Sequence, residues 1–548
     1  MPKQLVVRMP KPELAAKYRA AGIWVDRTMA QELEAGLQRM PDLRFKVWSD
    51  VRPFDGSFAE VENRAKRLAA YFRKIGIVPG DMVCFQLPNW VEAAETFMAT
   101  LFVGGITLPV VHTYGAKEMK FLLAQSGTKL LVTTRRFRSI DYEAMIEAIR
   151  PDLPDLEHVF YVDDYDRALA EPPIGSIYIA HPDEPAVINY TSGTTSDPKG
   201  VIKTHRVCVA EMIQREMREP GDSRPLAMAF PEGYREWLNV APIGHGGGLQ
   251  TGVEIPVIWG QSTQLIDHWD VDKILDILAQ GKACIPGSAT FFFNGLVNHP
   301  KFGSQHLDRM RYIASGGAPV PRAFGEQCES MGIKLFRGYG LSEHHSVAAS
   351  AFSDPVDKRI GTDGRPLAFT EIQIRDDGGK PVPVGVPGMI HTRGAELFVG
   401  YIDSSLNDAC FDSDGWFCTG DVGMMDADGY LTITDRIKDI IIRGGENVSA
   451  SEVENAIATM PEVLEVAVVA TPDTRMGEAV CAVICLRASV EAPDLKAVRR
   501  HVAGIGLARQ KWPERLWIVE EFERTPSGKI KKYALRDQLQ REATATAV

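Results

Sequence analysis

A segment rich in hydroxyl groups and glycine, YTSGTTSDPKG at residues 190–200, contains the densest set of residues that could bind a phosphate. Gly193 and Gly200 permit a close ligand approach, and exposed backbone N–H groups can donate to anionic oxygens. Lys199 adds a mobile positive charge. Hydroxyl groups come from Thr191, Ser192, Thr194, Thr195 and Ser196. The order Pro-Lys-Gly at the end excludes a Walker A loop. The segment predicts a phosphate-binding loop or an ordinary polar surface loop.

Three later segments carry residues suited to a nucleotide or to its metal ion. His245 follows a strand-like run and precedes three glycines, and ASGGAPVP at 314–321 is small enough to lie flat against a ring. In GYGLSEHH at 338–345, Tyr339 offers an aromatic face and Glu343 a hard oxygen ligand that suits Mg²⁺. A structural histidine and two tight turns are the alternative interpretation.

The last third of the chain adds three motifs that contain carboxylate or lysine side chains. GWFCTGD at 415–421 ends in Asp421, whose carboxylate could accept both hydroxyls of a ribose. In DRIKDIIIRGGENVSASEVE at 435–454, Ser449 and Glu452 have the spacing of a helix capping box. RTPSGKIKK at 524–532 contains Lys529 and, taken alone, is typical of a flexible basic tail.

These motifs, in this order from residue 190 to residue 529, resemble the AMP-forming adenylating superfamily of acyl-CoA synthetases, adenylation domains and luciferases. The resemblance implies that ATP or AMP is bound by Thr191, Ser192, Gly193, Thr194, Thr195, Lys199, Gly317, Ala318, Pro319, Gly338, Tyr339, Gly340, Ser342, Asp421 and Arg436. Ser342 stands where the family usually has threonine, and it keeps the hydroxyl group.

The resemblance also implies catalytic roles for Lys529, Lys199, His245 and Glu343. Lys529 would bridge the substrate carboxylate and the α-phosphate, and Glu343 would bind Mg²⁺. The acyl pocket would include His245, Gly246, Gly247, Ser315 and Gly316. Lys438 matches the hinge of the family's small domain, and Gly444, Gly445 and Glu446 lie in the loop that approaches coenzyme A.

The implied reaction joins a small carboxylic acid to AMP from ATP, releases pyrophosphate, and then transfers the acyl group to coenzyme A. Alternatives are transfer to a separate carrier protein, a luciferase-like oxygenase, which we disfavour, and a non-catalytic nucleotide or acyl sensor. Phe291, Phe292 and Phe293 could flank an aromatic or alicyclic acid of medium size, or could be ordinary core.

Composition narrows the classes of partner. The 548-residue chain is 45% hydrophobic and 24% charged, and its net charge of −11 argues against nucleic-acid binding and against general binding to anionic membranes. Its eight cysteines are scattered without a CxxC pair, which is typical of a reducing compartment. We find no apolar run of about 18 residues and no signal peptide, so we expect a cytoplasmic protein without an integral membrane segment. The sequence leaves both a monomer and a homo-oligomer open.

Alternating helices and short apolar strands before residue 165 predict an α/β domain with a largely parallel sheet. A strand at 186–189 should precede the phosphate loop, and a helix should begin at about Val201. Strands near 371–375 and 388–392 predict a small antiparallel β-subdomain. We therefore expect a large N-terminal α/β domain over residues 1–435 and a small, mobile α/β domain over residues 436–548.

Overall fold

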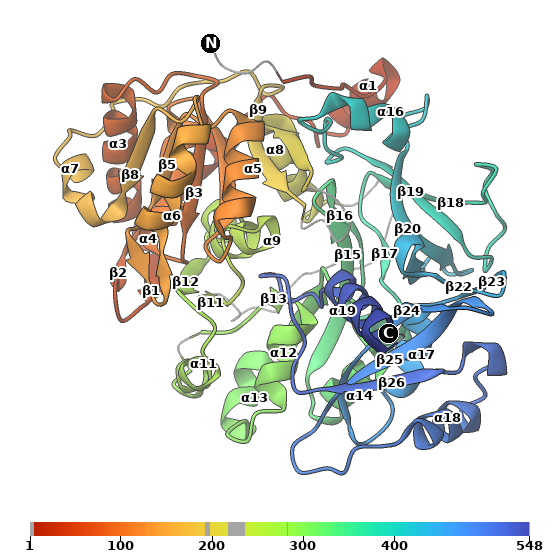
Figure 1. Ribbon diagram of the computed structural model, residues 1–548. Coiled ribbons are helices and arrows are strands. Elements are labelled where there is room, and N and C mark those ends of the chain that lie inside the picture. Colours follow the sequence, from red (N-terminus) through yellow and green to blue (C-terminus); the bar gives the residue numbers. More distant parts are fainter. Residues whose placement is uncertain (1–4, 192–197, 218–235, 282, 547–548) are drawn as a thin grey trace.

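The computed structural model describes residues 5–191, 198–217, 236–281 and 283–546. These residues form a large N-terminal region of several sheets and a smaller C-terminal domain (Figure 1). The mixed α/β class expected from the sequence is confirmed. Within the described residues, no helix is long and apolar enough to cross a membrane.

The first sheet has six strands in the order β10-β9-β4-β3-β5-β8. All of its strands are parallel except β10, which is antiparallel to β9. The strands are β3 (Met82–Leu87), β4 (Ile106–Val111), β5 (Leu130–Thr133), β8 (His158–Tyr161), β9 (Pro185–Tyr190) and β10 (Gly200–Thr204). The helices of this part of the chain are α3 (Phe58–Lys74), α4 (Val91–Phe102), α5 (Ala116–Ser126), α6 (Tyr142–Ile149) and α7 (Asp166–Leu169), and Figure 1 shows them around the sheet.

The prediction of a helix from Val201 is wrong, because residues 200–204 form strand β10. Valine and isoleucine at 201 and 202 favour a strand, and the Ile202 N–H donates to the Gly400 carbonyl, so a distant segment satisfies the backbone. The helix α8 (His205–Gln214) begins only after Thr204, whose side chain accepts from the Val207 amide. The phosphate loop therefore joins two antiparallel strands.

Two further sheets complete the α/β part. The second contains β1 (Arg44–Trp48), β2 (Phe54–Ser57), β11 (Glu236–Asn239) and β12 (Ser262–Ile266). The third contains β13 (Gly287–Ser288), β14 (Tyr312–Gly316), β15 (Lys334–Leu341), β16 (His344–Ala349) and β17 (Arg365–Pro366). The helices of the same region are α2 (Met29–Arg39), α9 (Gly246–Leu249), α10 (Ile255–Trp259), α11 (Val271–Ala279), α12 (Thr290–Val297), α13 (Ser304–Met310), α14 (Arg322–Ser330) and α15 (Val356–Gly361). A π-helical turn at Gln250–Glu254 joins α9 to α10.

The expected β-subdomain is an antiparallel sheet of β18 (Thr370–Arg375), β19 (Gly388–Gly394), β20 (Phe417–Met425) and β21 (Leu431–Arg436). The short helix α16 (Asn407–Cys410) lies between β19 and β20 in the chain. In the register of β20 against β21, Asp421 lies opposite Arg436. Two residues fifteen positions apart are therefore neighbours across a hairpin.

The C-terminal domain has its own sheet and its own core. The sheet contains β22 (Ile441–Arg443), β23 (Glu446–Val448), β24 (Val463–Asp473), β25 (Gly477–Leu486) and β26 (Arg515–Val519), with helices α17 (Ala450–Ile457), α18 (Leu495–Gly504) and α19 (Lys532–Thr546). The Ser449 side chain caps α17 by accepting from the Glu452 amide, as the motif predicts. Buried residues from β22, α17, β25 and α18 pack together in this domain.

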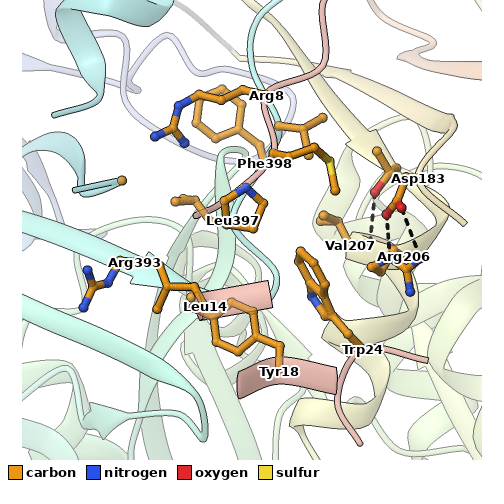
Figure 2. Close-up of a pocket in the computed structure, with 16 residues that line it drawn as sticks. Arg8, Leu14, Tyr18, Trp24, Asp183, Arg206, Val207, Arg393, Leu397 and Phe398 are labelled. Atoms are coloured by element: carbon orange, nitrogen blue, oxygen red, sulfur yellow. Dashed lines mark hydrogen bonds and ion pairs between the residues drawn. The ribbon is translucent and has the colours of Figure 1, made fainter. Parts of the chain in front are cut away.

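The N-terminal segment, with α1 (Pro12–Ala20), packs on the chain that leads from β19 to Tyr401. The Arg8 N–H donates to the Val399 carbonyl at 2.7 Å, and the Trp24 indole donates to the Ala395 carbonyl at 2.8 Å. Figure 2 shows Trp24 beside Arg206 and Tyr18 beside Leu14 around a cavity of about 30 Å³. This packing holds the segment that carries Tyr401.

Candidate active site

The candidate site is a cavity of about 230 Å³ in which the third sheet, the start of α9 and one loop of the C-terminal domain meet. Its lining includes many of the residues predicted from the sequence: His245, Gly247, Ser315, Gly316, Gly317, Gly338, Tyr339, Gly340, Ser342 and Lys529. Elements that are separate in the sequence therefore form one site.

Lys529 reaches this cavity from a tight turn of the C-terminal domain. The turn is closed by the Thr525 N–H, which donates to the Lys529 carbonyl at 2.8 Å, and by the Gly528 N–H, which donates to the Thr525 carbonyl. Gly528 has a φ of +86°, which favours glycine. Burial, together with the charge of Arg436, lowers the pKa of the Lys529 ammonium to about 8, although Asp421 and Glu343 oppose that shift.

His245 lies at the start of α9 on the wall of the same cavity. Burial lowers the pKa of its imidazole to about 3, and the charges of Lys529 and His345 act in the same direction. His245 is therefore a neutral ring that can accept or donate a hydrogen bond beside the ammonium of Lys529.

The carboxylate of Asp421 is held between two groups. Tyr339 donates its hydroxyl to Asp421 Oδ2 at 2.6 Å, and Arg436 Nε lies 2.9 Å from Asp421 Oδ1. Burial raises the pKa of the Tyr339 hydroxyl well above its ordinary value, as does the negative charge of Asp421. Tyr339 is thus a firm donor, and the three predicted nucleotide residues form one cluster.

Glu343 and Lys199 meet on a residue that the sequence did not single out. Tyr401 donates its hydroxyl to Glu343 Oε1 at 2.7 Å, and Lys199 Nζ lies 5.1 Å from the centre of the Tyr401 ring. Tyr401 belongs to no motif used in the sequence analysis. Pairing with β10 brings it here, because the Ile202 N–H donates to the Gly400 carbonyl and Tyr401 itself forms a bridge with Val201.

The two ends of the phosphate loop are joined by hydrogen bonds. The Thr191 N–H donates to the Lys199 carbonyl at 3.0 Å, and the Lys199 N–H donates to Thr191 Oγ1 at 3.2 Å. Ser192, Gly193, Thr194 and Thr195 lie outside the described residues.

Residues 33–402 match the family model described as AMP-binding enzyme, and residues 452–529 match the model of the AMP-binding enzyme C-terminal domain. The chain belongs to the AMP-binding enzyme family. The medium-chain fatty-acid–CoA ligase of Escherichia coli (strain K12) is 31% identical to it over 540 residues, which cover 96% of this chain and 93% of that ligase. A feruloyl-CoA synthase of an Amycolatopsis species is 30% identical over 488 residues, 88% of this chain and 93% of the synthase. The crystal structure of ATP-bound MatB from Rhodopseudomonas palustris superposes with a TM-score of 0.80 at 25% identity, covering 93% of this chain and 98% of MatB.

The glycines at the site of this AMP-binding enzyme differ in how closely other atoms surround them. A Cβ on Gly316 would lie 2.4 Å from the Gly338 carbonyl oxygen, and one on Gly246 would lie 2.8 Å from the His345 ring. A Cβ on Gly248 would lie 2.0 Å from the Pro242 carbonyl oxygen, whereas Gly247 faces the cavity. Of the three glycines after His245, two are required by close packing, whereas a Cβ on Gly247 would meet His245 Nδ1 at an ordinary contact distance of 3.7 Å. Ala318 and Pro319 follow Gly317 in the chain and are outside the cavity lining.

The three phenylalanines at 291–293 have three different surroundings. Phe292 lines the cavity, and Phe293 is buried in the core below it. Phe291 faces the C-terminal domain, because the Arg524 guanidinium lies 4.5 Å from the centre of its ring and a Cβ on Gly528 would touch it at 3.0 Å. Phe291 and Arg524 are contact residues between the domains that the sequence reasoning missed.

The remaining predicted residues of the C-terminal domain lie away from the cavity lining. Lys438 is in a short helical turn after β21, where burial lowers the pKa of its ammonium and Arg436 adds to the shift. Gly444 and Gly445 form the turn between β22 and β23 with φ angles of +60° and +88°, and Glu446 follows them. Lys529 therefore lines the cavity, and the turn at Gly444 and Gly445 does not.

Replacing Asp421 with asparagine tests the nucleotide cluster. The change keeps the shape of the side chain but removes the charge that Arg436 faces, so we expect AMP to bind about 10- to 100-fold more weakly, as for hydrogen bonds to a charged group. Calorimetric titration with AMP measures this. Asp428→Asn is the matched control, because its carboxylate pairs with Lys358 at the surface. Unchanged AMP affinity in Asp421→Asn would show that Asp421 does not bind the nucleotide.

Proposed function

We propose that this protein is an AMP-forming acid–CoA ligase. In the first step an oxygen of a carboxylic acid attacks the α-phosphorus of ATP, the bond to the bridging oxygen breaks, and acyl-AMP and pyrophosphate form. In the second step the coenzyme A thiol attacks the acyl carbon, AMP leaves, and a thioester forms. The observation that carries the proposal is the position of Lys529, which enters the cavity beside His245 and near the Tyr339, Asp421 and Arg436 cluster. The names of the relatives, medium-chain fatty-acid–CoA ligase and feruloyl-CoA synthase, agree with it.

The proposed roles follow from charge. Lys529 supplies a positive charge between the attacking carboxylate and the α-phosphate as negative charge builds there, and Lys199 neutralises the outer phosphates. Asp421 and Arg436 hold the ribose, and Tyr339 presents its ring to the adenine. His245 orients the carboxylate as a neutral donor. No protein nucleophile takes part.

Magnesium fits this set of residues as a partner of ATP. Among the described residues no three acidic, histidine or cysteine side chains gather in a group that could hold a metal. Mg²⁺ commonly uses one or two carboxylates together with substrate phosphates and water. Glu343, fixed by Tyr401, would be that carboxylate, and the ion would neutralise charge on the phosphates.

We also propose that the C-terminal domain begins near Arg436 and turns about Lys438 between the two steps. Lys529 and the turn at Gly444 and Gly445 belong to the same domain, but only Lys529 lines the cavity. A rotation that withdraws Lys529 would bring the glycine turn and Glu446 toward coenzyme A. Such domain movements gate the chemistry and do not perform it.

The cavity favours a carboxylic acid of medium size. Its walls include Phe292, Pro242 and Leu367, and its volume is about 230 Å³. Coenzyme A is the proposed acceptor, and a carrier protein is the alternative that a direct assay must separate. The eight cysteines are all free, which fits a reducing compartment such as the cytoplasm.

Replacing Lys529 with alanine should separate the two half-reactions. Loss of a positioned charge in the transition state typically costs about 10² to 10³ in rate, so acid-dependent pyrophosphate release should fall by that factor. Conversion of supplied acyl-AMP to acyl-CoA should continue. The control is Lys531→Ala, whose ammonium pairs with Glu523 and does not line the cavity. An equal loss of both half-reactions in Lys529→Ala, or pyrophosphate release as in the wild type, would contradict the proposed role.

The pH dependence of the first step should report the ammonium of Lys529. Because its pKa is lowered to about 8 in the free protein, the charged form is complete well below pH 8 and is lost as the pH rises through that value. We expect kcat/KM for pyrophosphate release to fall about tenfold per pH unit above this point. Lys529→Arg keeps a charge that does not titrate in this range. If kcat/KM of Lys529→Arg still falls above pH 8, the group that titrates there is not Lys529.

Replacing Phe291 with alanine should destabilise the orientation of the C-terminal domain in which Lys529 lines the cavity. Arg524 loses the ring beneath its guanidinium, and cation–π contacts of this kind contribute about 0.5 to 2 kcal/mol. We expect pyrophosphate release to slow by about 2- to 30-fold while thioester formation from supplied acyl-AMP keeps its rate. Phe302→Ala is the control, because its ring stacks on His306 of the same domain. Equal slowing of both half-reactions by Phe291→Ala would refute the orienting role.

A further inference from the structure

A buried cluster of charged side chains lies behind the cavity, on β10 and α8. Lys203 Nζ is 3.1 Å from Glu211 Oε2, and both side chains are 2% exposed. The other oxygen of Glu211 is 3.1 Å from His345 Nδ1 and 3.7 Å from Arg215 Nη2. A single carboxylate thus contacts two cations and one imidazole. None of these contacts involves a residue that we assign to the adenylation chemistry.

This cluster reaches the cavity through four side chains, which we call the polar wall: Arg215, Gln250, His345 and Ser346. Arg215 Nη2 donates to Gln250 Oε1 at 2.9 Å and to Ser346 Oγ at 2.7 Å. The Gln250 amide donates in turn to Glu211. The polar wall is therefore a fixed hydrogen-bonded surface that is backed by buried charge.

The polar wall extends away from His245 along α9, since its member His345 is close to Gly246 and its member Gln250 lies beyond the end of the helix. Gln250 follows His245 by five residues of continuous helix, and at about 1.5 Å per residue this is roughly 7 Å further along the axis. The helix changes to a π turn at Gln250–Glu254. Turns of this kind are rare and frequently mark functional sites. Here the turn brings Gln250 to the cavity while Glu254 remains buried in the cluster.

Two further carboxylates, those of Glu254 and Glu396, are buried in this cluster. Burial raises the pKa of Glu254 to about 8 and that of Glu396 to about 8, and the negative charge of Glu211 adds to both shifts. Burial opposes the charge on Glu211, but Lys203 and His345 hold its pKa well below its ordinary value. Glu211 is thus the carboxylate that faces Lys203 and Arg215. The guanidinium of Arg215, the amide of Gln250 and the hydroxyl of Ser346 line the cavity, and they can donate hydrogen bonds to an oxygen of a ligand.

We propose that the acid activated at this site carries a second oxygen function, at the end remote from the reacting carboxylate, and that Arg215, Gln250 and Ser346 bind it. This inference rests on the proposed function. The oxygen function is a hydroxyl, carbonyl or carboxylate group, which all accept hydrogen bonds from a guanidinium. Apolar residues, among them Phe292 and Leu367, line the pocket as well and suit the alkyl or aromatic part of the acid.

The test compares matched acids with the full-length enzyme. The pairs are octanoate with 8-hydroxyoctanoate and octanedioate, and 3-phenylpropanoate with 3-(4-hydroxyphenyl)propanoate. Initial rates of pyrophosphate release and of acyl-CoA formation give kcat/KM for each acid. A hydrogen bond to a charged group predicts a preference of about 10- to 100-fold for at least one oxygenated acid over its plain partner.

Variants then assign that preference to the polar wall. Arg215→Met should reduce the preference ratio toward one, Arg215→Lys should restore part of it, and Ser346→Ala should reduce it in part. A general folding defect lowers the rate with both acids of a pair alike and leaves the ratio of their kcat/KM values unchanged. Phe292→Leu is the control on the apolar side of the pocket, and we expect it to lower kcat/KM equally for both acids of a pair.

Equal or better use of the plain acids by the wild-type enzyme would overturn the inference and leave the ligase proposal standing. A preference that persists in Arg215→Met and Ser346→Ala would also overturn it, because the oxygen function would then bind elsewhere. Absence of pyrophosphate release with every acid, together with intact AMP binding, would overturn the proposed function and this inference with it.

Discussion

The ammonium of Lys529 is held in a partly dehydrated cavity close to another cation, Arg436, and the rest of the site compensates for this arrangement. Burial and Arg436 disfavour the charged form, and Asp421 and Glu343 favour it without fully balancing it. A bound acid and a triphosphate would add the missing negative charge at the place where the reaction concentrates it. The strength of such a charge comes from its fixed position before substrate arrives, because no solvent must reorganise around it in the transition state. The carboxylates of Asp421 and Glu343 are accordingly fixed by tyrosine hydroxyls.

The position of Lys529 depends in turn on a contact between domains. Arg524 lies over Phe291, and the backbone of Gly528 lies against the same ring, so the turn that carries the lysine is aligned by one aromatic side chain of the large domain. Arg487 adds a hydrogen bond to Asn298 at 3.2 Å. These contacts join the large domain to a domain with its own sheet and core. Such an interface can hold one orientation and still release it, which is what two successive half-reactions on one pocket require.

The sequence predicted features that depend on contiguous residues, and it failed where a contact with a distant segment determines the local structure. The helix cap at Ser449 follows from local spacing and is found as expected. The nucleotide roles of Thr191, Lys199, Tyr339, Asp421 and Arg436 stay predictions, and the structure brings the last three together. The helix expected from Val201 is a strand because Gly400 pairs with it, and sequence pattern carries no sign of that partner. Tyr401 was missed for the same reason. Lys203, Glu211 and Arg215 were also missed, because isolated charges in an apolar stretch give no motif, although charged residues are rarely buried without partners.

The hairpin of β15 and β16 connects the two ends of the pocket. Within eight residues it carries Tyr339 and Glu343, which we propose for the nucleotide and its metal ion, and His345 and Ser346 of the polar wall. The register of this hairpin is irregular between Tyr339 and Leu341, and a Cβ on Gly340 would lie 1.8 Å from the His345 carbonyl oxygen, so the two strands approach closely at this point. A group that binds at the polar wall would therefore contact the same hairpin that carries Tyr339 and Glu343. Binding energy from the remote end of the acid can in this way be used to align the reacting carboxylate, since a fixed unit transmits position between its two ends.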